Sequence, residues 1–464
     1  MTFIAARDLS SGMKARELAQ VEKRLGLWLD HVFGGLGRRE RVEALGNYLR
    51  GLLLEGERKS IEPMAMRLSA DASHAEAMRQ RLQQAVNVAK WDARLVFERV
   101  AHQAEAHLPG IDAWVLDDTG MPKKGFKSVG VKRQYSGTMG RVDNCQVTTS
   151  LHLASELGGV CIGMRLYLPS DWAEDPKRRG RTGVPDEVDF EEKWRIGLGM
   201  VDDALTWGLE RRVVVADAAY GDCIDFRDEL DERRLRYIVG LTGTAVVWPP
   251  GVMPRPPPPR KKMGRTPTKW REPKGGAAVP ASELAAGLPA SAWRKVTWRE
   301  GSRGPQSSRF AAIRIRTAHR HAVGEAPSEE RWLLCEWPRR QKQPSKLYLS
   351  NMPATTSLKQ LVYLAKLRWR IERDYQEMKS ELGLDHFEGR GWTGFHHHAA
   401  CVAAAHAFLA LERARFSPED PVDQHLRLPP DRAARVAPTN WDLSALLPVD
   451  QRAGPSKALA NVIK

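Results

Sequence analysis

Acidic residues at three distant places in the chain have positions that suit metal-dependent chemistry at phosphate. Asp117 and Asp118 follow the apolar run AWVL, and Asp217 follows the apolar run VVVA. Carboxylates at the ends of buried strands are held still, and hard cations such as Mg²⁺ prefer oxygen ligands. Any single aspartate of this kind could instead be a turn-forming residue. Together they predict some of the carboxylate ligands of a divalent-metal site. Such a site could promote in-line displacement at phosphorus.

A predicted helix supplies a further carboxylate. In RWRIERDYQEMK, Arg368, Glu372 and Lys379 are separated by four and seven residues, so they lie on nearly the same face of an α-helix. One interpretation is a surface ion-pair ladder, worth a few tenths of a kcal/mol for each pair. The other is a metal ligand, Glu372, flanked by two cations. Glu377 lies about 140° around the helix from Glu372 and is expected to face away.

Composition indicates a polyanionic partner. The 464 residues include 72 Lys plus Arg against 57 Asp plus Glu, which gives a formal charge of +15 and a pI of about 9.7. Such a balance favours nucleic acid or an anionic membrane as partner. No apolar run approaches the roughly 18 residues of a membrane span, so no span is expected. The five cysteines are scattered and form no CxxC pair, and the first residues lack a signal-peptide layout, which together favour the cytoplasm.

The order of predicted elements indicates an α/β fold with an RNase H-like core. Strands are predicted in AWVLDDT, CQVTTSLHLA, GVCIGMRLYLP and RRVVVAD, with a helix before the last of them and the Glu372 helix, from Ser357 to about Leu382, near the end. Five regions are predicted: an α-helical N-terminal domain (1–105), the first part of the core (106–243), a β-rich insertion with a Pro-rich basic loop (244–345), the second part of the core (346–415) and a C-terminal tail (416–464).

Several motifs resemble the DDE transposases of bacterial insertion sequences, in particular the IS701 group of the IS4-like set. In that set a Tyr, an Arg, a Glu and a Lys are separated by two, three and six residues. Arg368, Glu372 and Lys379 fit these intervals, whereas Ala365 holds the tyrosine position and Tyr363 lies two residues earlier. The other matching segments are DDTGMPKKG (117–125), RQYSGTMGRVDNCQV (133–147), RLYLPSDW (165–172) and VVADAAYGD (214–222).

The resemblance implies a catalytic, metal-binding triad of Asp118, Asp217 and Glu372. The family's first aspartate precedes a threonine, which favours Asp118, with Asp117 as the alternative. Two Mg²⁺ ions, for which Mn²⁺ could substitute, are the expected cofactors. The residues expected to contact DNA are Arg368, Lys379, Lys123, Lys124, Arg133 and Tyr135.

The activity implied is cleavage at transposon ends followed by transfer of the 3′-hydroxyl end to target DNA. The partners would be double-stranded DNA, namely terminal inverted repeats and target, held by a homodimer, with no membrane partner. The N-terminal helices would bind the transposon ends, and the protein would associate with the bacterial nucleoid. Two alternatives remain at this point: an RNase H-like endonuclease without strand transfer, and a catalytically silent, domesticated DNA-binding protein.

Overall fold

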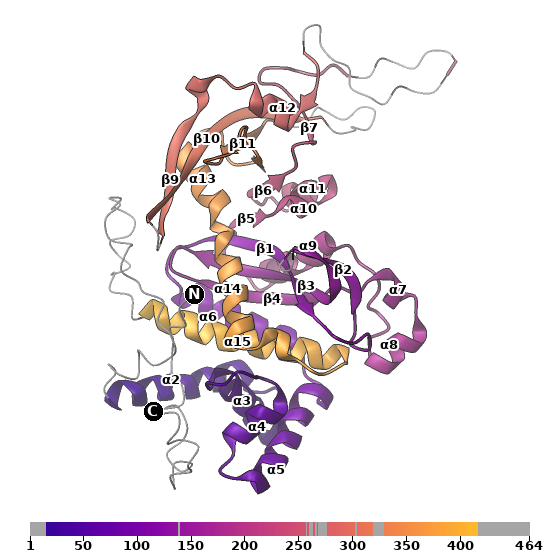
Figure 1. The fold of residues 1–464 in the computed structure, drawn as a ribbon, viewed down its shortest axis with the longest axis vertical. Coiled ribbons are helices and arrows are strands. Elements are labelled where there is room, and N and C mark those ends of the chain that lie inside the picture. Colours follow the sequence, from indigo (N-terminus) through magenta and orange to yellow (C-terminus); the bar gives the residue numbers. More distant parts are fainter. Residues whose placement is uncertain are drawn as a thin grey trace.

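The strands form one mixed sheet with helices packed against it (Figure 1). A computed structural model describes residues 15–415 apart from 138–139, 257, 259–262, 265–266, 268–275, 302–303 and 319–328. The strand order is β2-β3-β1-β5-β6-β12-β11-β10-β7-β8, with β4 also paired to β3 and β9 to β10. The central order β4-β3-β1-β5-β6, antiparallel on the β3 side of β1 and parallel on the β5 side, confirms the predicted RNase H-like core.

The core elements follow the sequence pattern closely. β5 and β6 read VVVA and YIVGL, and such continuous apolar runs are typical of parallel strands buried on both faces. The bounds are β1 Ile111–Pro122, β2 Lys132–Ser136, β3 Arg141–Ser155, β4 Gly159–Leu166, α7 Ser170–Ala173, α8 Pro176–Thr182, α9 Lys193–Thr206, β5 Val213–Ala216, α10 Ala218–Gly221, α11 Ile224–Glu232 and β6 Tyr237–Leu241.

The insertion continues the sheet of the core. β12 pairs antiparallel with both β6 and β11, so the insertion strands are joined edge-on to the RNase H-like strands. Most of the predicted Pro-rich basic loop lies outside the described residues. The bounds are β7 Val246–Trp248, β8 Val279–Pro280, α12 Ala281–Ala286, η2 Ala290–Ala292, β9 Arg294–Gly301, β10 Gly304–Thr317, β11 Arg331–Trp337 and β12 Lys346–Ser350.

A helical layer at the other end of the molecule packs on the long helix α15 (Trp392–Arg415) (Figure 1). α15 is buried almost all round, and its many alanines allow neighbouring elements to approach closely. No helix of the described chain is long and apolar enough to cross a membrane. The predicted tail 416–464 lies outside the described residues. The layer comprises α2 Ala15–Phe33, α3 Arg39–Leu53, α4 Ile61–Leu68, α5 Ala72–Gln83, η1 Gln84–Val88 and α6 Ala93–His107.

Consecutive histidines at the start of α15 join the helical layer to the core. The ring nitrogens of His397 lie 2.9 and 2.8 Å from the carbonyl oxygens of Val86 and Trp91, and its ring stacks on Trp91. Nδ1 of His398 lies 2.8 Å from the hydroxyl of Tyr48. These side chains are buried and satisfied by the protein itself, so they stabilise the domain contact.

The segment predicted as one helix from Ser357 to about Leu382 is two helices. α13 (Leu358–Leu367) ends and α14 (Trp369–Ser380) begins at Arg368, which caps both and keeps helical dihedral angles. After α14 come η3 (Leu384–His386) and then α15. The predicted polar face survives because Arg368 and Lys379 both reach β1, at Asp117 and at the carbonyl of Gly120.

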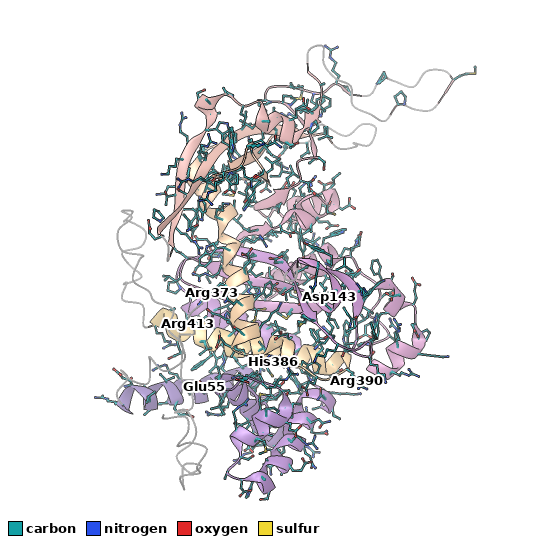
Figure 2. The ribbon with its side chains drawn as sticks, viewed as in Figure 1. Glu55, Asp143, Arg373, His386, Arg390 and Arg413 are labelled. Atoms are coloured by element: carbon teal, nitrogen blue, oxygen red, sulfur yellow. The ribbon has the colours of Figure 1, made fainter. Side chains whose placement is uncertain are left out.

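Buried polar contacts also join α14 to β3 and α15. The carboxylate of Asp374 lies 2.8 Å from Nδ1 of His152, and the hydroxyl of Tyr375 lies 2.6 Å from that of Ser150; both partners are on β3. Further along, Glu377 meets α15, where Arg413 donates to it; Arg413 and the neighbouring Arg373 are labelled in Figure 2. Glu377 therefore faces away from Glu372, as predicted.

Replacing Gly159 should disturb the seat of α14. A Cβ atom at this position of β4 would lie 2.1 Å from an Oδ atom of buried Asp374. We expect Gly159→Ala to lower the free energy of unfolding by about 1–3 kcal/mol, because the strand or the carboxylate must shift. Chemical denaturation measures the effect. Gly180→Ala, in α8 with nothing within 4 Å of the added atom, is the control and should cost nothing. Equal stability of the two variants would contradict this account.

Replacing Glu377 should reveal a pH-dependent contribution to stability. Burial opposes its charge, but His406, whose Nε2 lies 3.3 Å from Oε2 of Glu377, and the charge of Arg413 outweigh burial and lower the pKa of Glu377. A lowered pKa stabilises the fold above the unfolded pKa of about 4.3, and this contribution disappears as the pH falls. We expect Glu377→Gln to cost about 1–3 kcal/mol at pH 7 and progressively less below pH 4, measured by denaturation across pH. Glu381→Gln, at an exposed position, is the control.

Candidate active site

The register of two parallel strands brings Asp117 and Asp217 together. Val115 of β1 pairs with Val215 of β5, and each aspartate lies two residues further along its own chain. β5 ends at Ala216, and Asp217 caps α10 by accepting a hydrogen bond from the backbone N–H of Ala219 at 2.9 Å. β1, in contrast, continues to Pro122, so Asp117 lies within the strand rather than at its end as predicted.

Arg368 connects this pair to the glutamate of α14. Its guanidinium donates to the carboxylate of Asp117 and, at 3.0 Å, to Oε1 of Glu372. Asp117 is buried, and burial raises its pKa to about 7 although Arg368 lowers it; the charge of Asp217 raises it further. The charges of Asp117, Glu372 and Asp217 all act on Arg368 and raise its pKa against the opposing effect of burial. Arg368 therefore forms ion pairs with two of the carboxylates, those of Asp117 and Glu372.

The three carboxylates are not arranged around one common metal position in this structure. Among the described residues, no three His, Cys, Asp or Glu side chains are placed to hold one metal ion. Glu372 is largely exposed, at 63% for its side chain, whereas Asp117 is at 12%. Arg368 thus joins Asp117, which is fixed on β1, to Glu372 on the rim, and Asp217 lies at the start of α10.

Asp118, favoured from the sequence as the first ligand, faces the other side of β1. Its Oδ1 accepts hydrogen bonds from Tyr220 at 2.6 Å and Thr149 at 3.0 Å, and its Oδ2 pairs with Lys193 at 2.8 Å. Successive side chains of a strand alternate between faces, so only one of the two aspartates can meet Glu372. The structure brings Asp117 to that face and leaves Asp118 away from it.

Two lysines predicted to contact DNA are engaged with the protein backbone. The ammonium of Lys123 donates to the carbonyl of Phe387 at 2.7 Å, and that of Lys379 to the carbonyl of Gly120 at 2.8 Å. Burial lowers the pKa of Lys123, and it lowers the pKa of Lys379 to about 8. Both side chains tie the segment around α14 to the end of β1 in this conformation.

The remaining predicted DNA contacts are on an exposed surface. Lys124 follows β1, and Arg133 and Tyr135 are on β2; all three are exposed, Tyr135 at 62%. Tyr363, considered as a substitute for the missing family tyrosine, donates to Asp112 at 2.7 Å near the start of β1. Tyr363 thus contacts Asp112 and not one of the carboxylates of the candidate site. Ala365 is buried in the core.

The insertion contacts the junction between α13 and α14. The guanidinium of Arg299, on β9, lies 3.8 Å from the ring centroid of Trp369, immediately after Arg368. One turn earlier, the ammonium of Lys366 forms an ion pair with buried Glu336 of β11 and lies 4.8 Å from the ring centroid of Trp298. Arg368 is therefore held between elements of the core and elements of the insertion.

Two glycines that sequence reasoning did not single out set the position of Asp217. A Cβ atom on Gly240 of β6 would lie 2.6 Å from the backbone nitrogen of Ala218, and one on Gly221 would lie 1.8 Å from the carbonyl oxygen of Gly240. The α10 turn therefore rests directly on β6. The signal available in the sequence was a glycine in the middle of an apolar strand, which often marks close backbone approach.

With this geometry in view, comparison with known proteins identifies the class. Residues 31–305 match the family model of the DDE superfamily endonucleases, so the chain belongs to that family. The chain is also similar to the probable transposase for insertion sequence element IS701 from Microchaete diplosiphon. That similarity is 34% identity over 128 residues, which cover 27% of this chain and 31% of the relative. The recognised resemblance to the IS701 group is thereby confirmed.

Substituting Gly240 should impair the site more than the fold. In Gly240→Ala the new methyl group would displace the Asp217 turn, and misplacement by about 1 Å can cost about 100-fold in rate. We expect divalent-ion-dependent DNA cleavage to fall at least about 10-fold, with a loss of stability of about 1–3 kcal/mol. Gly26→Ala, in α2 with nothing within 4 Å, is the control. Undiminished cleavage by Gly240→Ala would show that the turn tolerates displacement.

Proposed function

We propose that this protein is a DDE transposase that cleaves DNA at the ends of an insertion sequence and transfers the freed 3′-hydroxyl end to target DNA. The observation that carries the proposal is that Arg368 contacts both Asp117 and Glu372, while the register of β1 and β5 brings Asp217 level with Asp117. Membership of the DDE superfamily endonucleases supports the cleavage chemistry. The similarity to the IS701 relative supports transposition as the biological setting.

The donor set suits divalent cations, and we propose Mg²⁺, with Mn²⁺ as a substitute. The three groups are carboxylates, which are the ligands that such hard cations prefer. The register of the parallel strands β1 and β5 places Asp117 and Asp217 at the same level, two residues beyond the paired Val115 and Val215. When bound, two such ions would polarise the scissile phosphate and assist loss of the proton from the attacking hydroxyl or water. Asp117 takes the place that the sequence alone gave to Asp118.

Arg368 has a double role in this proposal. It pairs with Asp117 and Glu372 in this structure, and its guanidinium would leave them when divalent cations bind the carboxylates. A guanidinium released at this position can bind a DNA phosphate in a bidentate manner. Lys379, on the same side of α14, donates to the carbonyl of Gly120 on β1. When DNA is bound, its ammonium could instead contact a neighbouring phosphate.

The exposed surface beside the site would carry the DNA. Lys124, Arg133 and Tyr135 provide two cations and one aromatic ring beyond the end of β1, and the net charge of +15 favours a long polyanionic partner. We propose that the N-terminal helices, predicted as residues 1–105, bind the terminal inverted repeats. We also propose that a homodimer brings two ends together in the cytoplasm, on nucleoid DNA.

Removing the glutamate should separate catalysis from DNA binding. We expect Glu372→Ala to reduce cleavage of duplexes carrying the element's ends by at least about 1,000-fold in the presence of Mg²⁺, because a metal ligand is lost. Its affinity for the same DNA in Ca²⁺ should stay within about threefold, since phosphate contacts dominate affinity. Gel-based cleavage and binding assays measure both effects. Glu381→Ala, at the exposed end of α14, is the control and should cleave normally.

Pre-cleaved ends distinguish the transposase from its competitors. A transposase will join such an end to a target plasmid, whereas an endonuclease of the same fold will cut intact ends without joining. A silent DNA-binding descendant will bind the ends and do neither. Cleavage that persists in Glu372→Ala would overturn the assignment of the site.

A further inference from the structure

Asp118 has three polar partners, although it lies on the face of β1 that is turned away from Glu372. Its Oδ1 accepts from the hydroxyls of Tyr220 and Thr149, and its Oδ2 pairs with the ammonium of Lys193. These three partners come from α10, β3 and α9. A single carboxylate on β1 therefore contacts three separate elements on the face opposite Asp117.

The contact with Tyr220 leads directly to the second aspartate of the site. Tyr220 lies on the four-residue helix α10, and Asp217 caps the start of that helix. The ring of Tyr220 is buried at 2% exposure and packs edge-on against Phe226 of α11. A Cβ atom on Gly197 of α9 would lie 3.2 Å from that ring. The tyrosine thus has little freedom, and its hydroxyl is held 2.6 Å from Asp118.

We propose that Asp118 is a positioning residue, which fixes the Asp217 turn to β1 through the hydroxyl of Tyr220 and so sets the separation of Asp117 and Asp217. Asp118 holds the turn by accepting a hydrogen bond from Tyr220. Gly240 of β6 lies directly against the backbone of Ala218 and supports the turn from that strand. This inference rests on the proposed role of Asp117, Asp217 and Glu372 in holding divalent cations. It assigns Asp118 a role distinct from that of a ligand.

Two substitutions at Asp118 distinguish positioning from ligation. Asp118→Asn keeps an oxygen that can accept from Tyr220 and Thr149, whereas Asp118→Ala removes it. For a positioning residue we expect Asp118→Ala and Tyr220→Phe each to reduce cleavage by about 10- to 100-fold, as misplaced groups do. Asp118→Asn should stay within about fivefold of wild type, and the double variant Asp118→Ala/Tyr220→Phe should be no worse than the poorer single variant.

Binding of Mn²⁺ to the full chain without DNA, followed by electron paramagnetic resonance, gives a readout apart from activity. We expect Asp117→Asn to abolish high-affinity Mn²⁺ binding and Tyr220→Phe to weaken it about three- to tenfold, since only the first removes a ligand. Asp118→Asn should bind Mn²⁺ like the wild type. The matched control is a second hydrogen-bonded Asp–Tyr pair, formed by Asp112 of β1 and Tyr363 of α13. Tyr363→Phe should change neither DNA cleavage nor Mn²⁺ binding.

The outcomes separate this inference from the function on which it rests. Loss of Mn²⁺ binding in Asp118→Asn, equal to that in Asp117→Asn, would overturn the positioning role and make Asp118 a ligand. An additive double variant would also overturn it, because the two groups would then act independently. If Asp117→Asn, Asp217→Asn and Glu372→Ala all left Mn²⁺ binding and cleavage intact, the proposed function itself would fail.

Discussion

Three carboxylates and one guanidinium form the interaction on which the rest of the structure depends. Burial disfavours the ionisation of a carboxylate, and it is the main reason that the pKa of Asp117 is raised, with the charge of Asp217 adding to the effect. Arg368 offsets this cost by donating hydrogen bonds to Asp117 and Glu372. The charge of Asp217 also acts on Arg368. The guanidinium of Arg368 thereby compensates the buried carboxylate of Asp117.

α14 carries residues of the candidate site and is itself anchored by polar contacts to the sheet and to α15. One side carries Arg368, Glu372 and Lys379 toward β1, where each polar head has a partner or faces the rim. Further polar contacts join α14 to β3 and α15, through Asp374, Tyr375 and Glu377; of these, Tyr375 lies on the same side of the helix as Arg368. Buried polar groups of this kind are costly to leave unpaired, so they specify one seat for the helix.

The insertion is an extension of the catalytic sheet and also a neighbour of the site. β12 links it to β6, and Arg299 and Glu336 contact the residues on either side of Arg368. Arg368 sits where one helix gives way to the next, and the insertion packs against that junction.

Much of the fold could be predicted from local pattern. The apolar runs VVVA and YIVGL predicted buried strands, and the intervals between Arg368, Glu372 and Lys379 predicted a shared helix face. The choice between Asp117 and Asp118 could not be made in this way, because it depends on which face of β1 receives α14. Nor could the burial of Lys123 be predicted, since its partner is the carbonyl of Phe387, more than 250 residues away.

The sequence by itself determined the chemistry available to this protein: the acidic residues, their basic companions and the order of elements that carries them, because residue type and periodicity are local properties. Only the tertiary structure decided which aspartate joins the site, which lysines are engaged internally and how the Asp217 turn is held. Those outcomes depend on strand register and on close approaches at Gly159 and Gly240, which arise between segments that are distant in the chain.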